Sequence, residues 1–426
     1  MASLSRREWL AGATAAFAAF LGRPGAAAQA EARETWKNWS GAVSWTPRRV
    51  VRPGSVGDVV AAVRAGADAG EVVRVAGTGH SFVPLTATDG SFLLTNALSG
   101  VESIDREQRR ATVLAGTKLA DIHAPIHAAG LGMTTLPDID RQALAGAIAT
   151  ATHGTGRTIG SLSTQVTAVE LVDGRGRVVR TSASKRPDLL QAARVSLGAL
   201  GVLTRIELQL EPAFRLHEKT WVAPYEEAVA TLDEQIESHR HFEFFWVSNR
   251  DACLMKTLDP SDDDGDGERS DGELEGERVG WSGEIFPSVR NRRFNEIEFS
   301  VPITAGRACL AELRELMLGR HAAVTWPLEY RTVAADDAWL SPAYRRDTVT
   351  ISAHQAANLP YRPFFDDVES VFRNHDGRPH WGKMHGLRAA DLAQLYPRWD
   401  DFQRVRRELD PDGRFLSPYL RRILGA

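Results

Sequence analysis

The stretch VAGTGHS, residues 75–81, begins at the end of a mainly apolar and β-branched run, residues 72–76, that predicts a strand. Its glycines permit tight turns and allow backbone N–H groups to approach a phosphate closely. The stretch is not a Rossmann loop, because G-x-G-x-x-G is absent and no helix is expected to start there. A glycine-rich turn that holds a histidine is weak evidence alone, since such a histidine is often only a hydrogen-bonded loop residue.

Two further runs of small residues favour a site for a large ligand. The run AGAIATATHGTG, residues 145–156, contains no carboxylate, lysine or arginine. A planar ligand can lie against such a backbone, with threonine hydroxyls and N–H groups available to phosphates and ring heteroatoms. The third run, LGALGVLT at residues 197–204, leads into another expected strand.

Strands and helices alternate between about residue 45 and residue 212, which predicts an α+β unit. Arg49–Val51 is expected to form a strand, and Ser55 to cap a helix whose buried face carries Val59 and Val63. Further strands are expected at residues 92–94, 111–114, 166–172, 177–181 and 203–210, with a helix at 119–129. The sequence DGRG at 173–176 is typical of a hairpin turn.

The three small-residue runs, in this order and spacing, resemble the FAD-binding domain of the vanillyl-alcohol oxidase superfamily (PCMH/VAO type). Within it the chain is similar to the sugar-lactone and alditol oxidases, from Trp39 to Leu424. Residues 380–383 match the family's His-Trp-Gly-Lys motif, and residues 410–415 match its C-terminal signature. The resemblance implies two α+β subdomains around FAD at residues 42–212, followed by a substrate or cap domain at residues 213–426.

The resemblance also implies which residues hold FAD. The histidine of the family's Gly-x-Gly-His-Ser loop bonds covalently to the flavin 8α carbon, and His80 stands at that position. A neutral imidazole is a competent nucleophile near pH 7. The other residues that the resemblance places against FAD are Val75, Ala76, Gly77, Thr78, Gly79, Ser81, Ala147, Thr152, Thr155, Gly160, Ser161 and Val202.

The second half supplies residues for a substrate pocket. The sequence LEYR, residues 328–331, alternates like a strand, so Glu329 and Arg331 are expected on one face. A Glu-x-Arg pair alone is usually a surface ion pair. With the family motifs present, the resemblance implies that Glu329, Arg331, His354 and Lys383 line the pocket above the flavin, although His380 could take the place of His354.

The resemblance implies an oxidase that removes a hydride from a carbinol carbon of an aldonolactone, of the D-arabinono- or L-gulono-1,4-lactone type, and reduces O2 to H2O2. Alditol oxidases carry serine where this chain has Ala147, which favours lactones over polyols. Alternatives are an alditol oxidase, a dehydrogenase that passes electrons to a cytochrome or quinone, and the reductase of cell-wall precursor synthesis. A non-catalytic exported sugar-binding protein is disfavoured, because His80 and Lys383 are both present.

The N-terminal residues predict export. SRREWL at residues 5–10 precedes an alanine-rich apolar run, and AQA at 28–30 offers a cleavage site. We expect a twin-arginine signal over residues 1–30 and a periplasmic protein, with a plain secretory signal as the alternative. No later stretch reaches the ~20 apolar residues of a membrane span. The net charge of −4 gives no case for nucleic acid as a partner.

An acidic tract at residues 259–277 matches the calcium-loop pattern D-x-D-x-D-G-x5-E from Asp262 to Glu273. Arg269 occupies the position of the apolar anchor, so we expect a solvated loop and no metal site. The chain has two cysteines, Cys253 and Cys309, and can form one disulfide at most.

Overall fold

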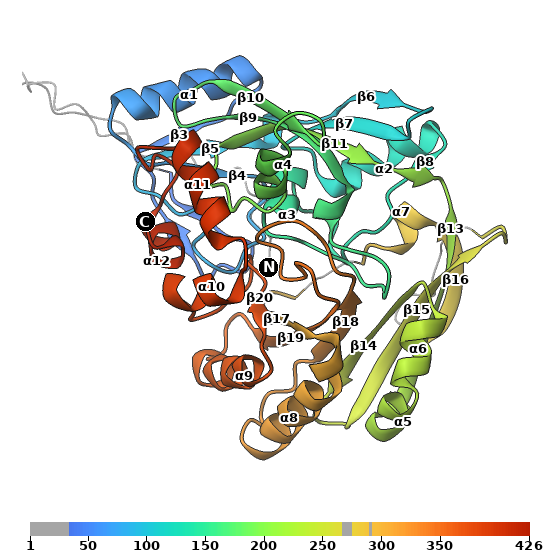
Figure 1. Cartoon of the computed structure of the whole chain (residues 1–426). Coiled ribbons are helices and arrows are strands. Elements are labelled where there is room, and N and C mark those ends of the chain that lie inside the picture. Colours follow the sequence, from blue (N-terminus) through green and yellow to red (C-terminus); the bar gives the residue numbers. More distant parts are fainter. Residues whose placement is uncertain (1–33, 266–274, 289–291) are drawn as a thin grey trace, which may run out of the picture. The chain divides into compact units, whose positions relative to one another are not determined.

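The structure, a computed structural model, describes residues 34–265, 275–288 and 292–426. These residues belong to one compact unit, Glu34–Ala426 (Figure 1). The expected signal at residues 1–30 lies outside the described residues, and so does the part of the acidic tract that holds Asp266 and Glu273. The expected solvated loop and the export signal therefore stay predictions.

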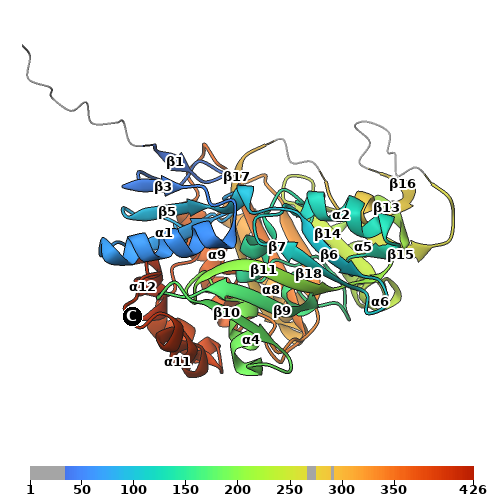
Figure 2. The same ribbon diagram turned by 90° about the horizontal axis from the view of Figure 1, so that it is seen from above.

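The first sheet is a small parallel one that positions the VAGTGHS loop. Its strand order is β3 (Arg49–Val51), β5 (Ser91–Leu94) and β4 (Val73–Ala76). Helix α1 (Val56–Asp68) begins at the Ser55 cap and packs Val59 and Val63 against one face. A hairpin of β1 (Trp36–Lys37) and β2 (Ser44–Trp45) covers the other face, so the loop after β4 leaves a layer supported on both sides (Figure 2).

The second sheet is antiparallel and has five strands. Their order is β10 (Val178–Ser182), β9 (Val166–Val172), β11 (Val202–Gln209), β7 (Arg110–Leu114) and β6 (Val101–Asp105). The expected turn at 173–176 joins β9 and β10, where the N–H of Gly176 donates to the carbonyl of Asp173. Helices that share one core with this sheet are α2 (Leu119–Ala128), α3 (Leu144–Ala149) and α4 (Pro187–Arg194).

The third sheet carries the substrate-side residues and has eight strands. Their order is β16 (Gly276–Trp281), β13 (Arg215–Pro224), β15 (Ala252–Ser261), β14 (His241–Val247), β18 (Leu328–Val333), β19 (Thr348–Ala356), β17 (Phe294–Pro302) and β20 (Arg378–Pro379). A separate two-stranded sheet pairs β8 (Leu131–Gly132), which lies between β7 and β9 in sequence, with β12 (Glu211–Pro212). Short elements complete the chain: α7 (Ser282–Ile285) and 3-10 helices at Thr95–Ala97, Leu162–Gln165 and Ile303–Ala305.

The two faces of the eight-stranded sheet differ in chemistry because side chains alternate along each strand. Phe244, Tyr330, Ile351 and Phe299 face one another in neighbouring strands and form an apolar row. This row shares the core with α8 (Gly306–Gly319) and α9 (Arg362–Asn374), where Phe372 stacks on Phe299 at 4.9 Å. Helices α5 (Tyr225–Ala230) and α6 (Leu232–Ser238) pack at β13, β14 and β15. The opposite face is left to form a site.

The end of the chain returns to the first sheet (Figure 1). After α10 (Ala389–Leu395) and α11 (Trp399–Leu409), the carboxylate of Asp410 accepts hydrogen bonds from the N–H groups of Arg414 and Phe415 and closes a turn. Phe415 then packs with Val59 and Val63, and α12 (Pro418–Leu424) ends the chain. Residues after 409 thus complete the N-terminal core, and the domain boundary at 212 stays a prediction.

Two further observations concern the described residues as a whole. Cys253 and Cys309 are both buried and free. None of the helices in the described part of the chain combines the length and the hydropathy that a membrane crossing requires.

Candidate active site

The three small-residue runs meet in one cavity, here called the cofactor cavity. Its walls include residues 75–81 after β4, and Ala145, Ala147, Thr150 and Thr152 at and after α3. The third run contributes Leu197, Gly198, Gly201 and Leu203, and Trp36, Trp39 and Trp45 close one side. Segments more than one hundred positions apart therefore build a single site, as their composition predicted.

The loop 77–81 exposes its backbone to this cavity. A Cβ atom on Gly77 would lie 2.3 Å from the Cβ of Ala143, and Gly79 has a left-handed φ of +74°. The carbonyl of Gly79 accepts from the N–H of Trp39 at 2.8 Å, which fixes the loop. The N–H groups of residues 78–81 donate to no group in the described part of the chain. Consecutive free N–H groups in a glycine turn form an anion-binding nest.

Two buried polar atoms at the cavity also lack partners. Neither Nε1 of Trp45 nor Oε1 of Gln142 has a hydrogen-bond partner among the described residues. An unpaired buried polar atom costs about 1–3 kcal/mol, so a polar ligand at this position would relieve a real penalty. The nest, the unpaired atoms and the flat small-residue walls fit FAD, which has a pyrophosphate, a polar ring edge and planar ring systems.

Most of the predicted cofactor residues lie on the cavity wall. They are His80, Val75, Ala76, Gly77, Thr78, Gly79, Ser81, Ala147 and Thr152. The wall does not include Thr155, Gly160, Ser161 or Val202. Val202 packs in the core with Val59 and Phe415, and a Cβ on Gly160 would meet the side chain of Thr164. Contacts of these four residues with FAD stay predictions.

Thr155 instead joins two parts of the fold. Its hydroxyl donates to the carbonyl of Phe242 at 2.5 Å and accepts the N–H of Thr332 at 3.2 Å. The carbonyl of Thr155 also contacts Nδ1 of His241 at 2.6 Å. The second small-residue run is thereby fixed against β14 and β18 of the eight-stranded sheet.

His80 is set up as a neutral nucleophile. Its ring stacks on Trp39 with centroids 5.9 Å apart, and neither ring nitrogen bonds to a described residue. Burial, and to a smaller extent the charge of Lys383, lowers the pKa of His80 to about 4. The imidazole therefore keeps a free lone pair at neutral pH.

A second cavity of about 600 Å³, here called the chamber, adjoins the first. Both share a wall made of Ile139, Gln142, Thr152, Glu296, His380 and Lys383. All four side chains predicted on the substrate side, Glu329, Arg331, His354 and Lys383, line the chamber. A ligand in the chamber would thus contact both these side chains and a ligand in the cofactor cavity.

Arg331 is the centre of a buried charge network. Its Nη2 atom lies 2.6 Å from Oε1 of Glu329 and 2.9 Å from Oδ2 of Asp138, and its Nε donates to Glu243 at 2.6 Å. Lys256 pairs with Glu243 at 3.0 Å. Burial alone would lower the pKa of Arg331, but the three carboxylates hold it well above its usual range. Arg331 is therefore a fixed cation.

Glu329 is the exceptional carboxyl of this network. Burial, together with the nearby charges of Asp138, Glu243 and Glu296, raises the pKa of Glu329 to about 8 against the opposing charge of Arg331. Glu329 consequently carries a proton at pH 7, and its O–H can donate a hydrogen bond to a ligand oxygen.

Lys383 and His354 flank another buried carboxylate, Glu296. The ammonium of Lys383 pairs directly with Glu296 and lies 5.1 Å from the centre of the Phe82 ring. Nδ1 of His354 is 2.8 Å from the carbonyl of Pro327, so this nitrogen donates. Nε2 of His354 lies 3.6 Å from Glu296, and the His354 side chain lines the chamber.

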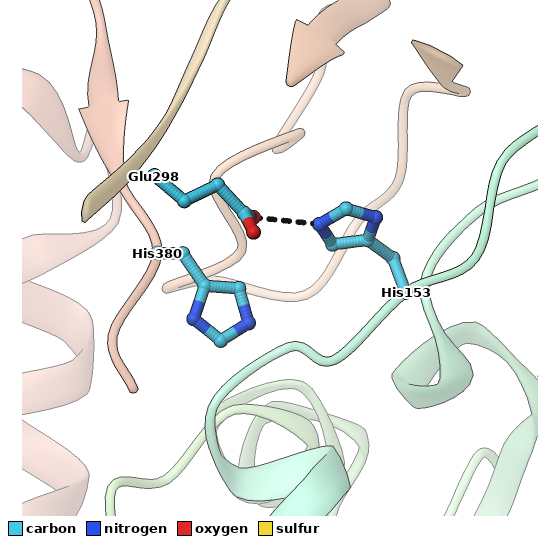
Figure 3. A group of neighbouring side chains, drawn as sticks. All are labelled: His153, Glu298 and His380. Atoms are coloured by element: carbon cyan, nitrogen blue, oxygen red, sulfur yellow. Dashed lines mark hydrogen bonds and ion pairs between the residues drawn. The ribbon is translucent and has the colours of Figure 1, made fainter. Parts of the chain in front are cut away.

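His153, Glu298 and His380 form a third group beside the shared wall, with ligating atoms within 4.8 Å (Figure 3). Both ring nitrogens of His153 face acceptors at 2.8 Å: the carbonyl of Gly154 and the carboxylate of Glu298. Burial raises the pKa of Glu298, but the charges of His153, His380 and Lys383 outweigh burial and hold that pKa well below its usual range.

The side chains of this third group are linked by hydrogen bonds. Nδ1 of His380 accepts the N–H of Gly382 at 3.0 Å, which leaves the ring proton on Nε2. The two other clusters with metal-ligand spacing, around Glu296 and around Asp138, pair with Lys383 and Arg331.

Several chamber residues were not predicted from the sequence. They are Asp138, His153, Glu296 and Glu298, with Glu243 and Lys256 behind them. The only local signal is the placement of acids inside apolar strands, in FEFF at 242–245 and NEIEF at 295–299. Buried acids in such strands are rare unless they are paired.

Comparison with known proteins agrees with this geometry. The sequence matches the family model described as D-arabinono-1,4-lactone oxidase over residues 206–280 and 267–423, and the model described as FAD binding domain over residues 47–182. The L-gulono-1,4-lactone dehydrogenase of Mycobacterium tuberculosis is 36% identical over 92% of this chain and 99% of its own length. The alditol oxidase of Streptomyces sp. is 31% identical over 91% and 98% of the two chains. The L-gulonolactone oxidase of Mus musculus is 28% identical over 91% and 98%.

Among solved structures, the cholesterol oxidase of B. sterolicum superposes with a TM-score of 0.82 at 17% identity, over 92% of this chain and 97% of that chain. This likeness concerns the fold alone. Together the matches confirm the expected fold, an FAD-binding domain of the vanillyl-alcohol oxidase type with a C-terminal domain. The chain is an FAD-dependent oxidoreductase acting on CH–OH groups. It belongs to the D-arabinono-1,4-lactone oxidase family.

Proposed function

We propose that the protein oxidises an aldonolactone at a carbinol carbon and carries its FAD covalently on His80. The observation that carries this proposal is the shared wall: Lys383, Glu296 and Thr152 line the cofactor cavity and the chamber together. A sugar in the chamber would therefore lie next to the cofactor. The relatives named lactone oxidases, lactone dehydrogenase and alditol oxidase support the substrate class.

The N–H groups of residues 78–81 would hold the FAD pyrophosphate. Polar atoms of FAD would also supply the hydrogen-bond partners that the side chains of Gln142 and Trp45 otherwise lack. Bound FAD would supply the acceptor for the hydride that leaves the substrate carbon. The covalent bond is supported by the neutral ring of His80, which lines the cavity with both nitrogens unbonded to the described residues. A lone pair of that ring is the nucleophile that such a bond requires; the bond would replace a C–H bond at the 8α carbon, with loss of its proton and transfer of the electron pair through the flavin to O2 or another acceptor.

The chamber groups have complementary roles toward a polyhydroxylated substrate. Glu329 donates a hydrogen bond from its protonated carboxyl to a substrate oxygen, and His354 contacts the substrate from the chamber wall. Lys383 is an ammonium at the shared wall and stabilises negative charge that develops on a substrate oxygen. Arg331 holds Glu329 in place through a 2.6 Å contact. These roles fix which carbinol carbon faces the cofactor cavity.

O2 is the proposed electron acceptor, with H2O2 as the product. The relative at 36% identity is named a dehydrogenase, which favours a second candidate: transfer of electrons to a redox carrier such as a cytochrome or quinone. The ratio of H2O2 formed to lactone consumed distinguishes them. We also propose export through the twin-arginine pathway, supported by Arg6 and Arg7 before the apolar run.

The covalent bond is tested on purified protein by acid precipitation, washing, and a visible spectrum of the redissolved pellet. A flavin spectrum should stay with the wild-type polypeptide and with His217→Ala, which removes an exposed histidine of β13. The washed His80→Ala polypeptide should show no flavin spectrum, because its flavin should be released into the supernatant. Flavin released from wild type would overturn the bond but keep the enzyme. Absence of lactone turnover in FAD-loaded protein, with O2 and with artificial acceptors, would overturn the proposed reaction.

A further inference from the structure

The sheet face that forms the chamber changes its chemistry midway across the strands. Residues directly opposite one another on neighbouring strands project from the same face of a sheet. The pairing register places six residues in one such row: Val222, Leu254, Phe245, Glu329, Ser352 and Glu298. The row is apolar on β13, β15 and β14, and it is polar or charged on β18, β19 and β17.

The next row repeats the division. Val247 faces Ala252 on the apolar half, and Glu296 faces His354 on the charged half. We call the apolar half the platform; it consists of Val222, Phe245, Val247, Ala252 and Leu254, all of which line the chamber. Trp326 and Pro327 line the chamber as well.

The platform is an open surface and not part of the sheet's core. Along β14 and β15 its residues are half-buried, whereas the alternate residues Trp246, Cys253 and Met255 are completely buried. Val222 is 44% exposed and is one of four large exposed hydrophobic residues in the described part of the chain. Antiparallel strands with one solvated face normally place polar residues there. The apolar residues at these positions therefore indicate a ligand surface.

The dimensions of the chamber also exceed what a plain sugar lactone needs. Sites of about 300–1,000 Å³ enclose drug-sized ligands, and the chamber volume of about 600 Å³ falls within that range. A five- or six-carbon lactone has hydroxyls on nearly every carbon and needs polar partners for them. Glu329, His354 and Lys383 supply such partners at the charged end, and Asn249 and Arg250, in the turn between β14 and β15, also line the chamber. The platform offers such a lactone none.

We propose that the substrate is a sugar lactone that bears an apolar substituent, with the sugar at the charged end and the substituent on the platform. This inference rests on the proposed function and deepens it. The substituent undergoes no reaction; it contributes binding energy through apolar contact with Phe245, Leu254 and Val222.

The test is a series of aldonolactones that are unsubstituted or acylated on the terminal primary hydroxyl with chains of increasing length. Steady-state kcat/KM is measured on the FAD-loaded protein, and binding to the oxidised protein is measured from the flavin difference spectrum. Both should improve about two- to fourfold per added methylene, the gain expected for burying a CH2 group. Val222→Gln and Leu254→Gln should flatten this dependence and leave turnover of the unsubstituted lactone unchanged.

Val178→Gln is the matched control, because Val178 is 47% exposed on β10 and lies in the five-stranded sheet. It should keep the wild-type dependence on chain length. Turnover of the unsubstituted lactone together with a flat or falling series would overturn this inference alone. Lack of turnover of every lactone in the series would overturn the proposed function, and this inference with it.

Discussion

Nη1 of Arg74 donates a hydrogen bond to the backbone carbonyl of Phe415 at 2.6 Å, across 341 positions of the sequence. The remaining N–H groups of the same guanidinium donate to the carbonyls of Leu85, Leu197 and Gly198. The side chain is 1% exposed and forms no ion pair with any described carboxylate. One arginine thus connects β4, the third small-residue run and the returning C-terminal segment.

These hydrogen bonds support a strained part of the cofactor cavity. Leu197 and Gly198 have left-handed φ values of +55° and +63°. A non-glycine residue in that conformation costs about 1–2 kcal/mol, so Leu197 needs support from its surroundings. Arg74 donates to the carbonyls of both residues, which line the cavity. The guanidinium therefore acts as a positioning group for the cofactor site.

Arg74→Met should destabilise the fold and empty the cofactor site. The substitution leaves four carbonyls without their donor, and each unsatisfied buried group costs about 1–3 kcal/mol. We expect the free energy of unfolding in urea to fall by about 3 kcal/mol or more, and the flavin content to fall with it. Arg175→Met, at an exposed position in the β9–β10 turn, should change neither. Arg74→Lys retains the charge but has fewer N–H donors than arginine. Wild-type stability in that variant would contradict the role of these hydrogen bonds in holding the site.

Gly79→Ala should prevent covalent flavin incorporation. The added Cβ would lie 2.1 Å from the ring of Trp36, so the loop or the tryptophan must move. Gly70→Ala is a close control, because Gly70 has a similar φ of +65° and no atom within 4 Å of the added Cβ. The control should lose only about 1 kcal/mol of stability and keep its flavin. The acid-precipitated pellet spectrum measures the difference, and equal flavin in both variants would show that the loop tolerates displacement.

The unusual carboxyl of Glu329 should give stability a particular pH dependence. Its folded-state pKa is raised to about 8 by burial, above the value of about 4.3 in an unfolded chain. The stability that this group contributes is complete below about pH 4 and is lost as the pH rises through about 8. Glu329→Gln does not have this loss. The free energy of unfolding of the variant minus that of wild type should therefore increase from pH 5 to pH 9.

Urea unfolding at three pH values between 5 and 9 measures that difference. Glu234→Gln, at an exposed position in α6, should give a difference that does not change with pH. A pH-independent difference for Glu329→Gln would mean that Glu329 is ionised in the folded protein throughout this range.

Local patterns in the sequence predicted the cofactor side and part of the chamber. The composition of residues 75–81 and 145–156 requires no knowledge of the fold, because small residues permit close approach wherever they lie. The alternation of LEYR correctly placed Glu329 and Arg331 on one face, since strand periodicity fixes side-chain direction. The Asp410 turn and the Ser55 cap were also predictable from short-range chemistry.

Long-range register explains what the sequence did not predict. Glu243 meets Arg331 only because β14 pairs with β18, 88 positions later, and no local pattern specifies that pairing. Arg74 occupies an alternate position in a strand, which in a two-layer sheet usually faces water. The side chain of Thr155 lies in a segment without periodicity, so its direction, toward Phe242 and Thr332, could not be inferred.

The pair of His153 and Glu298 should behave as one energetic unit. Removing one member of a buried ion pair leaves an uncompensated charge and costs about 3–5 kcal/mol. We therefore expect His153→Gln and Glu298→Gln each to lower the free energy of unfolding by that amount at pH 7. The double variant buries two neutral amides. It should lose less stability than the sum of the two single losses, with a coupling energy of about 2 kcal/mol.

His375 and Glu312 contact at the same 2.8 Å on the surface, and the same double-mutant cycle there should give a coupling energy of about 0–1 kcal/mol. Additive losses at His153 and Glu298 would mean that the two side chains are not a charged pair in the folded protein.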